Sequence, residues 1–323
     1  MTQKAARGPI IAYNFIAPLR DSILTHPSRP TVLEYTATEK PWEIPPEADL
    51  LMAFFAGWQD APQEKPAGWP YGLKQIQVLS AGVDKFPDWF FDGVTVTCGR
   101  GVSSIAIAEF AMTAVLAQEK QFVAVASGNV AVGSVGEKQV MRGVAGKTLA
   151  LLGTGAIGAA VAKRALAFDM RVLAHSRSGR APEGLDVTMM ADPRAMIAEA
   201  DHLIIAMPLT RETRAMVNAD LLSHARPGLH IVNVARGELV DNDALLAALD
   251  SGRVGYATLD VTDPEPLPEG HPLTKHPHVL ITPHIAWMSE DNLDKLVAKV
   301  WRDLDRYVAG EPPLDVVDRT AGY

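Results

Sequence analysis

The segment from Thr148 to Arg177 constrains the fold more than any other part of this 323-residue chain. An apolar run ends in a glycine-rich loop, an alanine-rich run follows, and a second short apolar run covers residues 171–175. In a strand–turn–helix–strand unit of this kind, the glycines allow a tight turn, a close approach to a pyrophosphate and close helix–strand packing. The phosphates would lie over the free amides at the helix N-terminus. The loop consists of Gly153, Thr154, Gly155, Ala156, Ile157 and Gly158.

The end of the second apolar run indicates which dinucleotide fits. A site for NAD usually places Asp or Glu there, about 20 residues beyond the glycines, on the ribose 2′-hydroxyl. Here the position reads Ser176, Arg177 and Ser178. Ser176 can hydrogen-bond a 2′-phosphate and Arg177 can pair with it. The sequence therefore favours NADPH over NADH, and the alternative is a solvated basic turn, because arginine is mostly exposed.

Length and composition limit the number of domains, the kinds of partner and the cellular compartment. The chain is long enough for two domains, and 48% hydrophobic with 21% charged residues is ordinary for a globular protein. A net charge of −8 argues against nucleic-acid and anionic-membrane partners. No apolar run is long enough to span a bilayer. The single cysteine, Cys98, excludes an internal disulfide and fits a reducing cytosol, so we expect a cytoplasmic protein in which Cys98 is a small buried hydrophobe.

The first 102 residues predict a small parallel sheet, because Pro- and Gly-rich stretches separate short apolar runs at 10–16, 31–37, 49–55, 75–80 and 94–98. Lys4 and Arg7 before the first run resemble a signal peptide. Asn14 interrupts that run and no small-residue cleavage site follows, so we expect a strand there. Residues 104–121 predict a helix that is apolar almost all round and buried on several sides, and residues 129–146 predict an irregular glycine-rich segment.

From Lys147 onward, strands and helices alternate, which predicts an α/β fold with a doubly wound parallel sheet. Asp192 before Pro193 and Asp241 predict helix starts, and Ser289 predicts the start of a last helix that ends at Gly310. No strand follows that helix, so we expect it to return to the first domain. The predicted domains are residues 1–102 with 288–323 for the substrate, and 103–287 for the dinucleotide. The apolar stripe of the last helix is Leu293, Leu296, Val297, Val300, Trp301, Leu304, Tyr307 and Val308.

Chemistry-bearing residues follow three strand-like runs of the second half. Arg236 comes after 229–232, Asp260, Asp263 and Glu265 after 256–259, and His284 after 279–281. Residues just beyond the carboxyl ends of parallel strands line the ligand crevice of such sheets. An arginine can clamp a carboxylate, a histidine can pass a proton, and an acid can orient the histidine. The pattern fits reduction of a 2-oxo acid beside a nicotinamide.

The motifs resemble the D-isomer-specific 2-hydroxyacid dehydrogenase family along nearly the whole chain. They are SAGVDKF at 80–86, IAEFAM at 107–112, GKTLALLGTGAIG at 146–158, PLTRET at 208–213, NVARGELVD at 233–241, LDVTDPEPLP at 259–268 and TPHIAW at 282–287. This resemblance implies a homodimer, with the 104–121 helix near its interface. It also implies a smaller flavodoxin-like substrate domain into which the nucleotide (Rossmann) domain is inserted.

The same resemblance implies the site residues. Arg236 binds the substrate carboxylate and carbonyl, and His284 donates the proton. Glu265 pairs with His284, with Asp263 as the alternative partner. Asp260 bonds the nicotinamide carboxamide. The backbone of Gly82 and Val83 holds the substrate carboxylate from the other domain, and Trp287 walls a small pocket, as in glyoxylate and hydroxypyruvate reductases, unless it serves ordinary packing. Further cofactor contacts are Met207, Pro208, Thr213, Val234 and Ala235.

We expect an NADPH-dependent reductase of glyoxylate or hydroxypyruvate. Two alternatives stay open: a family dehydrogenase that uses NAD on another 2-hydroxy acid, and a dinucleotide-sensing protein similar to the corepressors that resemble this family. Glu265 argues against formate dehydrogenases, which lack the paired acid, and the short tail argues against phosphoglycerate dehydrogenases with a regulatory tail. No metal is expected, because prolines flank the crowded histidines and no cysteine joins them. These histidines are His271, His276, His278 and His284.

Overall fold

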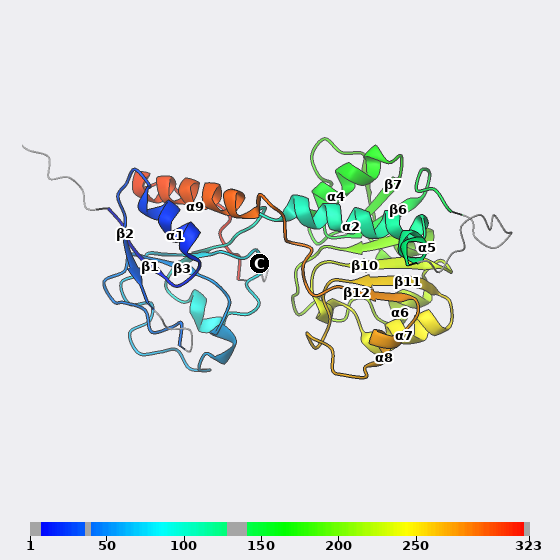
Figure 1. Cartoon of the computed structure of the whole chain (residues 1–323), viewed down its shortest axis with the longest axis horizontal. Helices are drawn as coiled ribbons and strands as arrows, with labels where there is room; N and C mark the ends of the chain where they lie inside the picture. Colours follow the sequence, from blue (N-terminus) through cyan, green and yellow to red (C-terminus); the bar gives the residue numbers. More distant parts are fainter. Residues whose placement is uncertain (1–7, 36–39, 128–140, 320–323) are drawn as a thin grey trace, which may run out of the picture. The chain divides into compact units, whose positions relative to one another are not determined.

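The computed structural model describes residues 8–35, 40–127 and 141–319. It divides into two compact units, Met1–Val102 with Ser289–Tyr323, and Ser103–Met288. Each unit has a parallel sheet with helices, as the α/β prediction required (Figure 1). The first unit contains β1 (Ile10–Tyr13), β2 (Thr31–Glu34), β3 (Leu50–Ala53), β4 (Gln75–Val78) and β5 (Thr95–Thr97), in the order β2-β1-β3-β4-β5 within the described residues.

Two helices cover one face of this sheet. Helix α1 (Ala17–Leu24) was not predicted, since only the apolar run at 10–16 before it was interpreted, as a strand; Pro18 lies in its first turn, where the missing N–H costs nothing. Helix α9 (Asn292–Ala309) begins three residues after the predicted Ser289, with Asp291 as its N-cap, and ends at Gly310, whose φ is +70°. Its apolar face packs with α1, β1 and β3. Val308 is 54% exposed, so its placement in the stripe was wrong, and Tyr307 covers that end of the cluster instead.

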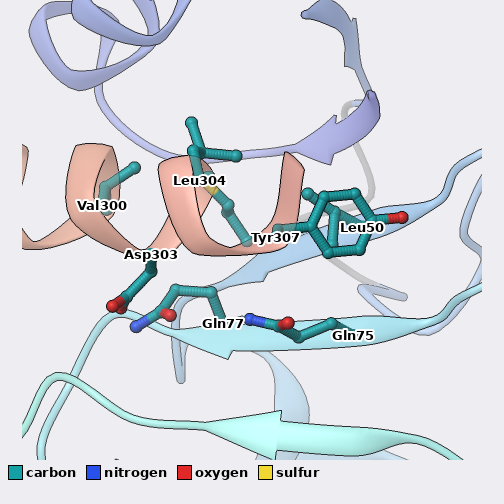
Figure 2. A pocket seen from close by; sticks show the side chains of 8 residues that line it. Leu50, Gln75, Gln77, Val300, Asp303, Leu304 and Tyr307 are labelled. Atoms are coloured by element: carbon teal, nitrogen blue, oxygen red, sulfur yellow. The ribbon is translucent and has the colours of Figure 1, made fainter. Parts of the chain in front are cut away.

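A small cavity lies between α9 and strands β3 and β4 (Figure 2). Asp303 points into it beside Gln77, and neither carboxylate oxygen of Asp303 has a hydrogen-bond partner in the described part of the chain. Lys299 Nζ lies 3.5 Å from Asp303 and 2.7 Å from Asp315. Burial raises the pKa of Asp303 because it penalises the charged form. The lysine thereby links α9 to the C-terminal segment, where Val316 pairs with Thr97.

The second unit has seven parallel strands among its described residues, in the order β12-β11-β10-β9-β6-β7-β8. Helices α2 (Ser104–Glu119) and α4 (Ala156–Ala167) pack on one face (Figure 1). Helices α5 (Pro193–Glu199), α6 (Ala219–Ser223), α7 (Asn242–Asp250) and α8 (Pro272–Lys275) pack on the other. The strands are β6 (Thr148–Leu152), β7 (Arg171–His175), β8 (Val187–Met189), β9 (His202–Ile205), β10 (Leu229–Asn233), β11 (Val254–Leu259) and β12 (Val279–Ile281).

Local signals place several helix ends. Asp192 Oδ1 accepts the Arg194 amide at 2.9 Å, and Asp241 Oδ1 accepts the Ala244 amide at 3.0 Å, so both predicted caps are confirmed. Helix α2 ends at Glu119, two residues early, because Gln121 adopts a φ of +51° and a short helix α3 (Phe122–Ala126) follows. Within its unit, α2 buries a mostly alanine face and leaves Ile105 40% exposed, and the predicted burial of its other sides, between domains or between subunits, stays a prediction. Residues 128–140 of the predicted irregular segment lie outside the described residues.

The strand order reverses between β6 and β9. From β6 the chain adds β7 and β8 on one side, then crosses to β9 and adds β10, β11 and β12 on the other. All pairings are parallel, so the residues after every strand lie at one edge of the sheet. In open α/β sheets the ligand crevice forms at such a switch point, outside the carboxyl ends of the strands.

Two buried histidines lie side by side under α2. His202 Nδ1 is 3.2 Å from His230 Nδ1, and His230 Nε2 is 3.1 Å from Thr258 Oγ1. His202 Nε2 is also 3.5 Å from Glu119 Oε1. The other carboxylate oxygen of Glu119, Oε2, lies 2.7 Å from Lys147 Nζ. Burial lowers the pKa of His202 to about 4 despite the nearby Glu119, and lowers that of His230 as well.

The free energy of unfolding should therefore fall as the pH drops below about 6.5. A histidine with a lowered folded-state pKa binds its proton more readily in the unfolded chain, so its contribution is complete above the unfolded value and is lost toward pH 4. For His202 the loss is about 2 kcal/mol between pH 7.5 and pH 5. Urea unfolding of the native protein and of a His202→Gln/His230→Gln variant measures this. Equal pH slopes for the two proteins would show that these histidines do not titrate on unfolding.

Candidate active site

The glycine loop after β6 is shaped by close backbone contacts. Gly153 has a φ of +103°, and a Cβ there would lie 2.6 Å from the Ala206 carbonyl oxygen. A Cβ on Gly158 would overlap the Gly153 carbonyl oxygen. At Gly155 the space that a Cβ would take has no other described atom within 4 Å. The first amides of α4 lack intrahelical partners, as in every helix. This open cradle at a helix N-terminus fits a pyrophosphate.

The turn after β7 lies against this loop. The Thr154 hydroxyl is 3.0 Å from the Ser176 hydroxyl and 3.1 Å from the Arg180 carbonyl oxygen, so the glycine loop and the turn hold each other. Ser176 is half-buried, while Arg177 and Ser178 are exposed. The turn that follows β7 therefore carries no carboxylate and offers two hydroxyls and a guanidinium beside the phosphate cradle.

The segment after β9 carries Met207, Pro208 and Thr213. The Thr213 hydroxyl donates to the Pro208 carbonyl at 2.8 Å and caps a tight turn with Thr210. In this turn a backbone amide lowers the pKa of Glu212, the Thr210 hydroxyl adds to that effect, and the Arg177 charge contributes a smaller part.

The turn that carries Arg236 is fixed by a buried asparagine. Asn233 Oδ1 accepts the Ala235 amide at 3.1 Å, and Asn233 Nδ2 donates to the Arg236 carbonyl at 2.8 Å. Val234 and Ala235 are buried beneath the turn, and Arg236 is half-buried. A Cβ on Gly237 would overlap the backbone of Thr262, so this glycine lets the arginine turn approach the segment after β11. Sequence reasoning missed Asn233 and Gly237, because their roles depend on which loops are neighbours.

His284 and Glu265 form the contact at the centre of the site. His284 Nδ1 lies 2.7 Å from Glu265 Oε1, and each side chain is 42% exposed. Asp263 is exposed, and its carbonyl accepts the Asn242 side-chain amide at 2.6 Å, so of the two acids that sequence left open the structure places Glu265 on the histidine. Because a carboxylate only accepts, Nδ1 carries the proton, and Nε2 is the nitrogen left for exchange with a ligand.

The loop that carries His284 is pinned by Asp260. This carboxylate is only 2% exposed. Its Oδ1 accepts the Thr282 hydroxyl at 2.7 Å and the Ile285 amide at 2.9 Å, and its Oδ2 accepts the Ala286 amide at 2.9 Å. The His284 amide donates to the Asp260 carbonyl at 2.9 Å. Asp260 therefore fixes the backbone on both sides of the histidine, a role that the sequence did not reveal.

Several other predicted residues are placed as follows. Trp287 is 44% exposed, and its Nε1 donates to the His284 carbonyl at 2.9 Å. Gly82 and Val83 belong to the other unit, where Val83 is in the core and the Ser80 hydroxyl donates to the Gly82 carbonyl at 2.8 Å. Cys98 is buried, as predicted, and burial raises the pKa of its thiol.

The described residues form neither a metal-binding cluster nor a membrane-spanning helix. Over residues 8–35, 40–127 and 141–319, no three His, Cys, Asp or Glu side chains gather into a group that could hold a metal ion. None of the described helices combines the length and apolar character that crossing a membrane requires.

Comparison with known proteins agrees with this geometry. Residues 112–286 match the family described as D-isomer specific 2-hydroxyacid dehydrogenase, NAD binding domain. A glyoxylate reductase of Thermofilum pendens is 33% identical over 256 residues, 76% of this chain and 75% of its own length. A crystal structure of a D-isomer specific 2-hydroxyacid dehydrogenase from Xanthobacter autotrophicus, in complex with NADPH and MES, is 29% identical, with a TM-score of 0.82 over 98% of this chain and 100% of that one.

A third relative is matched over a shorter stretch. Glyoxylate/hydroxypyruvate reductase A of Serratia proteamaculans is 38% identical over 179 residues, 54% of this chain. The matched part spans 56% of the Serratia protein.

Alanine substitutions at Gly155 and Gly158 should affect different properties, namely cofactor binding at Gly155 and stability at Gly158. Gly155→Ala places its methyl group in open space at an ordinary φ of −71°, so the melting temperature should stay within about 2 °C, while NADPH binding weakens at least tenfold because the methyl fills the cradle. Gly158→Ala should instead lower stability by about 1–3 kcal/mol, since its methyl overlaps backbone. Thermal unfolding and fluorescence titration with NADPH measure both effects. Undiminished NADPH affinity in Gly155→Ala would show that the phosphates bind elsewhere.

Proposed function

The chain belongs to the D-isomer specific 2-hydroxyacid dehydrogenase family, and on that premise we propose that it reduces a small 2-oxo acid to the D-2-hydroxy acid with NADPH. The observation that carries the proposal is the 2.7 Å contact between His284 and Glu265 at the sheet edge that also holds the glycine loop. When bound, the nicotinamide supplies a hydride to carbon 2 of the substrate.

The chain's own residues supply the proton and the orientation. Arg236 pairs with the substrate carboxylate and lies within reach of its carbonyl oxygen. His284 Nε2 gives its proton to that oxygen as negative charge develops on it, while Glu265 holds the proton on Nδ1 and orients the ring. The hydride and this proton together convert the ketone or aldehyde into the alcohol. Asp260 positions His284 by holding the loop around it. We also propose that Asp260 binds the nicotinamide carboxamide.

The proposed substrate class is a 2-oxo acid the size of glyoxylate or hydroxypyruvate. Support comes from the names of the Serratia and Thermofilum relatives and from Trp287, whose half-exposed ring suits the wall of a small pocket. In this proposal the first unit is the substrate domain and contributes the backbone of Gly82 and Val83. The second is the dinucleotide domain, with Met207, Pro208, Thr213, Val234 and Ala235 along the cofactor.

The proposed cofactor is NADPH rather than NADH. The turn after β7 offers Ser176, Arg177 and Ser178 where a carboxylate would select NAD. The Xanthobacter relative is described in complex with NADPH, which supports the proposal.

The proposed assembly is a homodimer. None of the five residues of α3 is buried, although all five are Phe, Val or Ala, in the sequence FVAVA. Phe122 is 65% exposed, Val123 47% and Val125 39%. An apolar patch of this kind on one helix indicates a protein–protein contact, and a second copy of the chain is the partner that the family implies.

His284→Ala should lower turnover about 100-fold or more while NADPH binding stays within about threefold, because loss of a proton donor acts on the chemical step. Glu265→Gln should also lower turnover, because a neutral amide forms a weaker hydrogen bond with Nδ1 than the carboxylate does. Initial rates of NADPH oxidation with a panel of 2-oxo acids measure both. Asp263→Asn is the matched control and should behave as the native enzyme. Native-like turnover of His284→Ala would remove the histidine from the mechanism.

Arg177→Ala should weaken NADPH binding about 10- to 100-fold and change NADH binding little, since it removes a charge-assisted partner of the 2′-phosphate. Ser176→Asp should reverse the preference by repelling the phosphate and offering a partner to the 2′-hydroxyl. The ratio of kcat/KM for the two cofactors is the readout. Arg171→Ala, at the amino end of the same strand and paired with Glu199 at 2.7 Å, should leave the ratio unchanged. A native enzyme that uses both cofactors equally would refute the assignment.

Sedimentation velocity should give twice the chain mass of 34.8 kDa. Phe122→Glu should shift the species toward the monomer, because it puts charge into the apolar patch. A native monomer at micromolar concentration would contradict the proposed assembly.

A further inference from the structure

The backbone of His284 adopts an uncommon conformation. Its φ is +53°, in the left-handed region that residues with a Cβ seldom occupy. Such a conformation persists only where the surroundings fix it. The direction of the imidazole depends on this backbone angle, because the Cα–Cβ bond turns with it. Whatever holds the two peptide groups of His284 therefore also holds its ring beside Glu265.

Asp260 holds the N–H of both peptide groups. Its carbonyl accepts the His284 N–H at 2.9 Å, and its Oδ1 accepts the Ile285 N–H of the following peptide group at 2.9 Å. The carbonyl of that following peptide group, which belongs to His284, accepts the Nε1–H of Trp287 at 2.9 Å. The indole thus closes a four-residue turn and binds the one polar atom of the two peptide ends of His284 that Asp260 does not contact.

We propose that Trp287 is a positioning residue for His284: its indole N–H, by binding the His284 carbonyl, keeps the imidazole in register with Glu265. This inference rests on the proposed reductase function and adds to it. A pocket wall needs only the face of the ring, whereas positioning needs the N–H. The two roles can therefore be separated by side chains that keep the ring and lose the donor.

Trp287→Phe retains an aromatic wall and removes the N–H. Loss of one hydrogen bond that orients a catalytic group predicts a fall in kcat of about 3- to 10-fold, with KM within about twofold. Benzothienylalanine at position 287, which has the indole shape without N–H, should behave as Trp287→Phe does. Trp287→Ala should lose kcat to the same extent and raise KM as well.

Trp301→Phe is the matched control. Trp301 Nε1 donates to the Ser22 hydroxyl at 2.9 Å, a bond of the same length between α9 and α1. Its loss should leave kcat and KM as in the native enzyme. A similar fall in kcat in this control would attribute the Trp287→Phe effect to general loss of stability.

A second readout does not depend on activity. In the cofactor-free protein, NMR relaxation of ¹³C-labelled histidine, with the His284 signal assigned by its loss in His284→Gln, measures how firmly that ring is held. The proposal predicts a more mobile His284 ring in Trp287→Phe than in the native protein. Unchanged ring mobility with unchanged kcat would overturn it, as would a rise in KM alone. If the native protein reduces no 2-oxo acid, the proposed function fails, and the NMR comparison still decides whether Trp287 positions His284.

Discussion

The parallel direction of the strands in the second unit is the constraint from which the site follows. Because all strands run the same way, the residues after β6, β7, β9, β10, β11 and β12 lie at one edge. The glycine loop, the basic turn, Arg236, Glu265 and His284 each follow one of these strands. Neighbouring strands are about 4.8 Å apart, so the four steps from β6 to β12 span roughly 19 Å, enough to lay a dinucleotide and a small acid side by side.

Within that edge, precision comes from buried polar groups that hold short loops. Asn233 fixes the turn before Arg236, and Asp260 fixes the loop around His284. A buried carboxylate is costly unless its oxygens are satisfied, and three donors satisfy those of Asp260. The same interactions that offset the cost of burying Asp260 therefore hold the proton donor in place. The half-exposed side chains of His284 and Glu265 can then exchange protons with a ligand while the backbone of the His284 loop stays fixed.

Sequence reasoning succeeded where a signal is local. The glycine loop, the strands formed by short apolar runs, and the helix caps at Asp192 and Asp241 each depend on a few consecutive residues. It failed where the partner is distant in the chain or the run is ambiguous. Helix α1 follows an apolar run that reads as a strand, and α9 begins at Asn292, with Asp291 rather than Ser289 before it. Position 237 needs glycine because the backbone of Thr262 leaves no room for a Cβ. The hydrogen bond from Trp287 to the His284 carbonyl could not be predicted, because it depends on the turn that the chain makes at His284.

The central claim is that a hydride passes from NADPH to a 2-oxo acid in the site at this sheet edge. Incubation with glyoxylate or hydroxypyruvate and NADPH deuterated at nicotinamide carbon 4, followed by mass spectrometry of the product, tests it most directly. The account predicts a 2-hydroxy acid with one deuterium bound to carbon 2, and none of this product from His284→Ala on the same time scale. A product without deuterium, or no turnover of any 2-oxo acid while NADPH still binds, would contradict it.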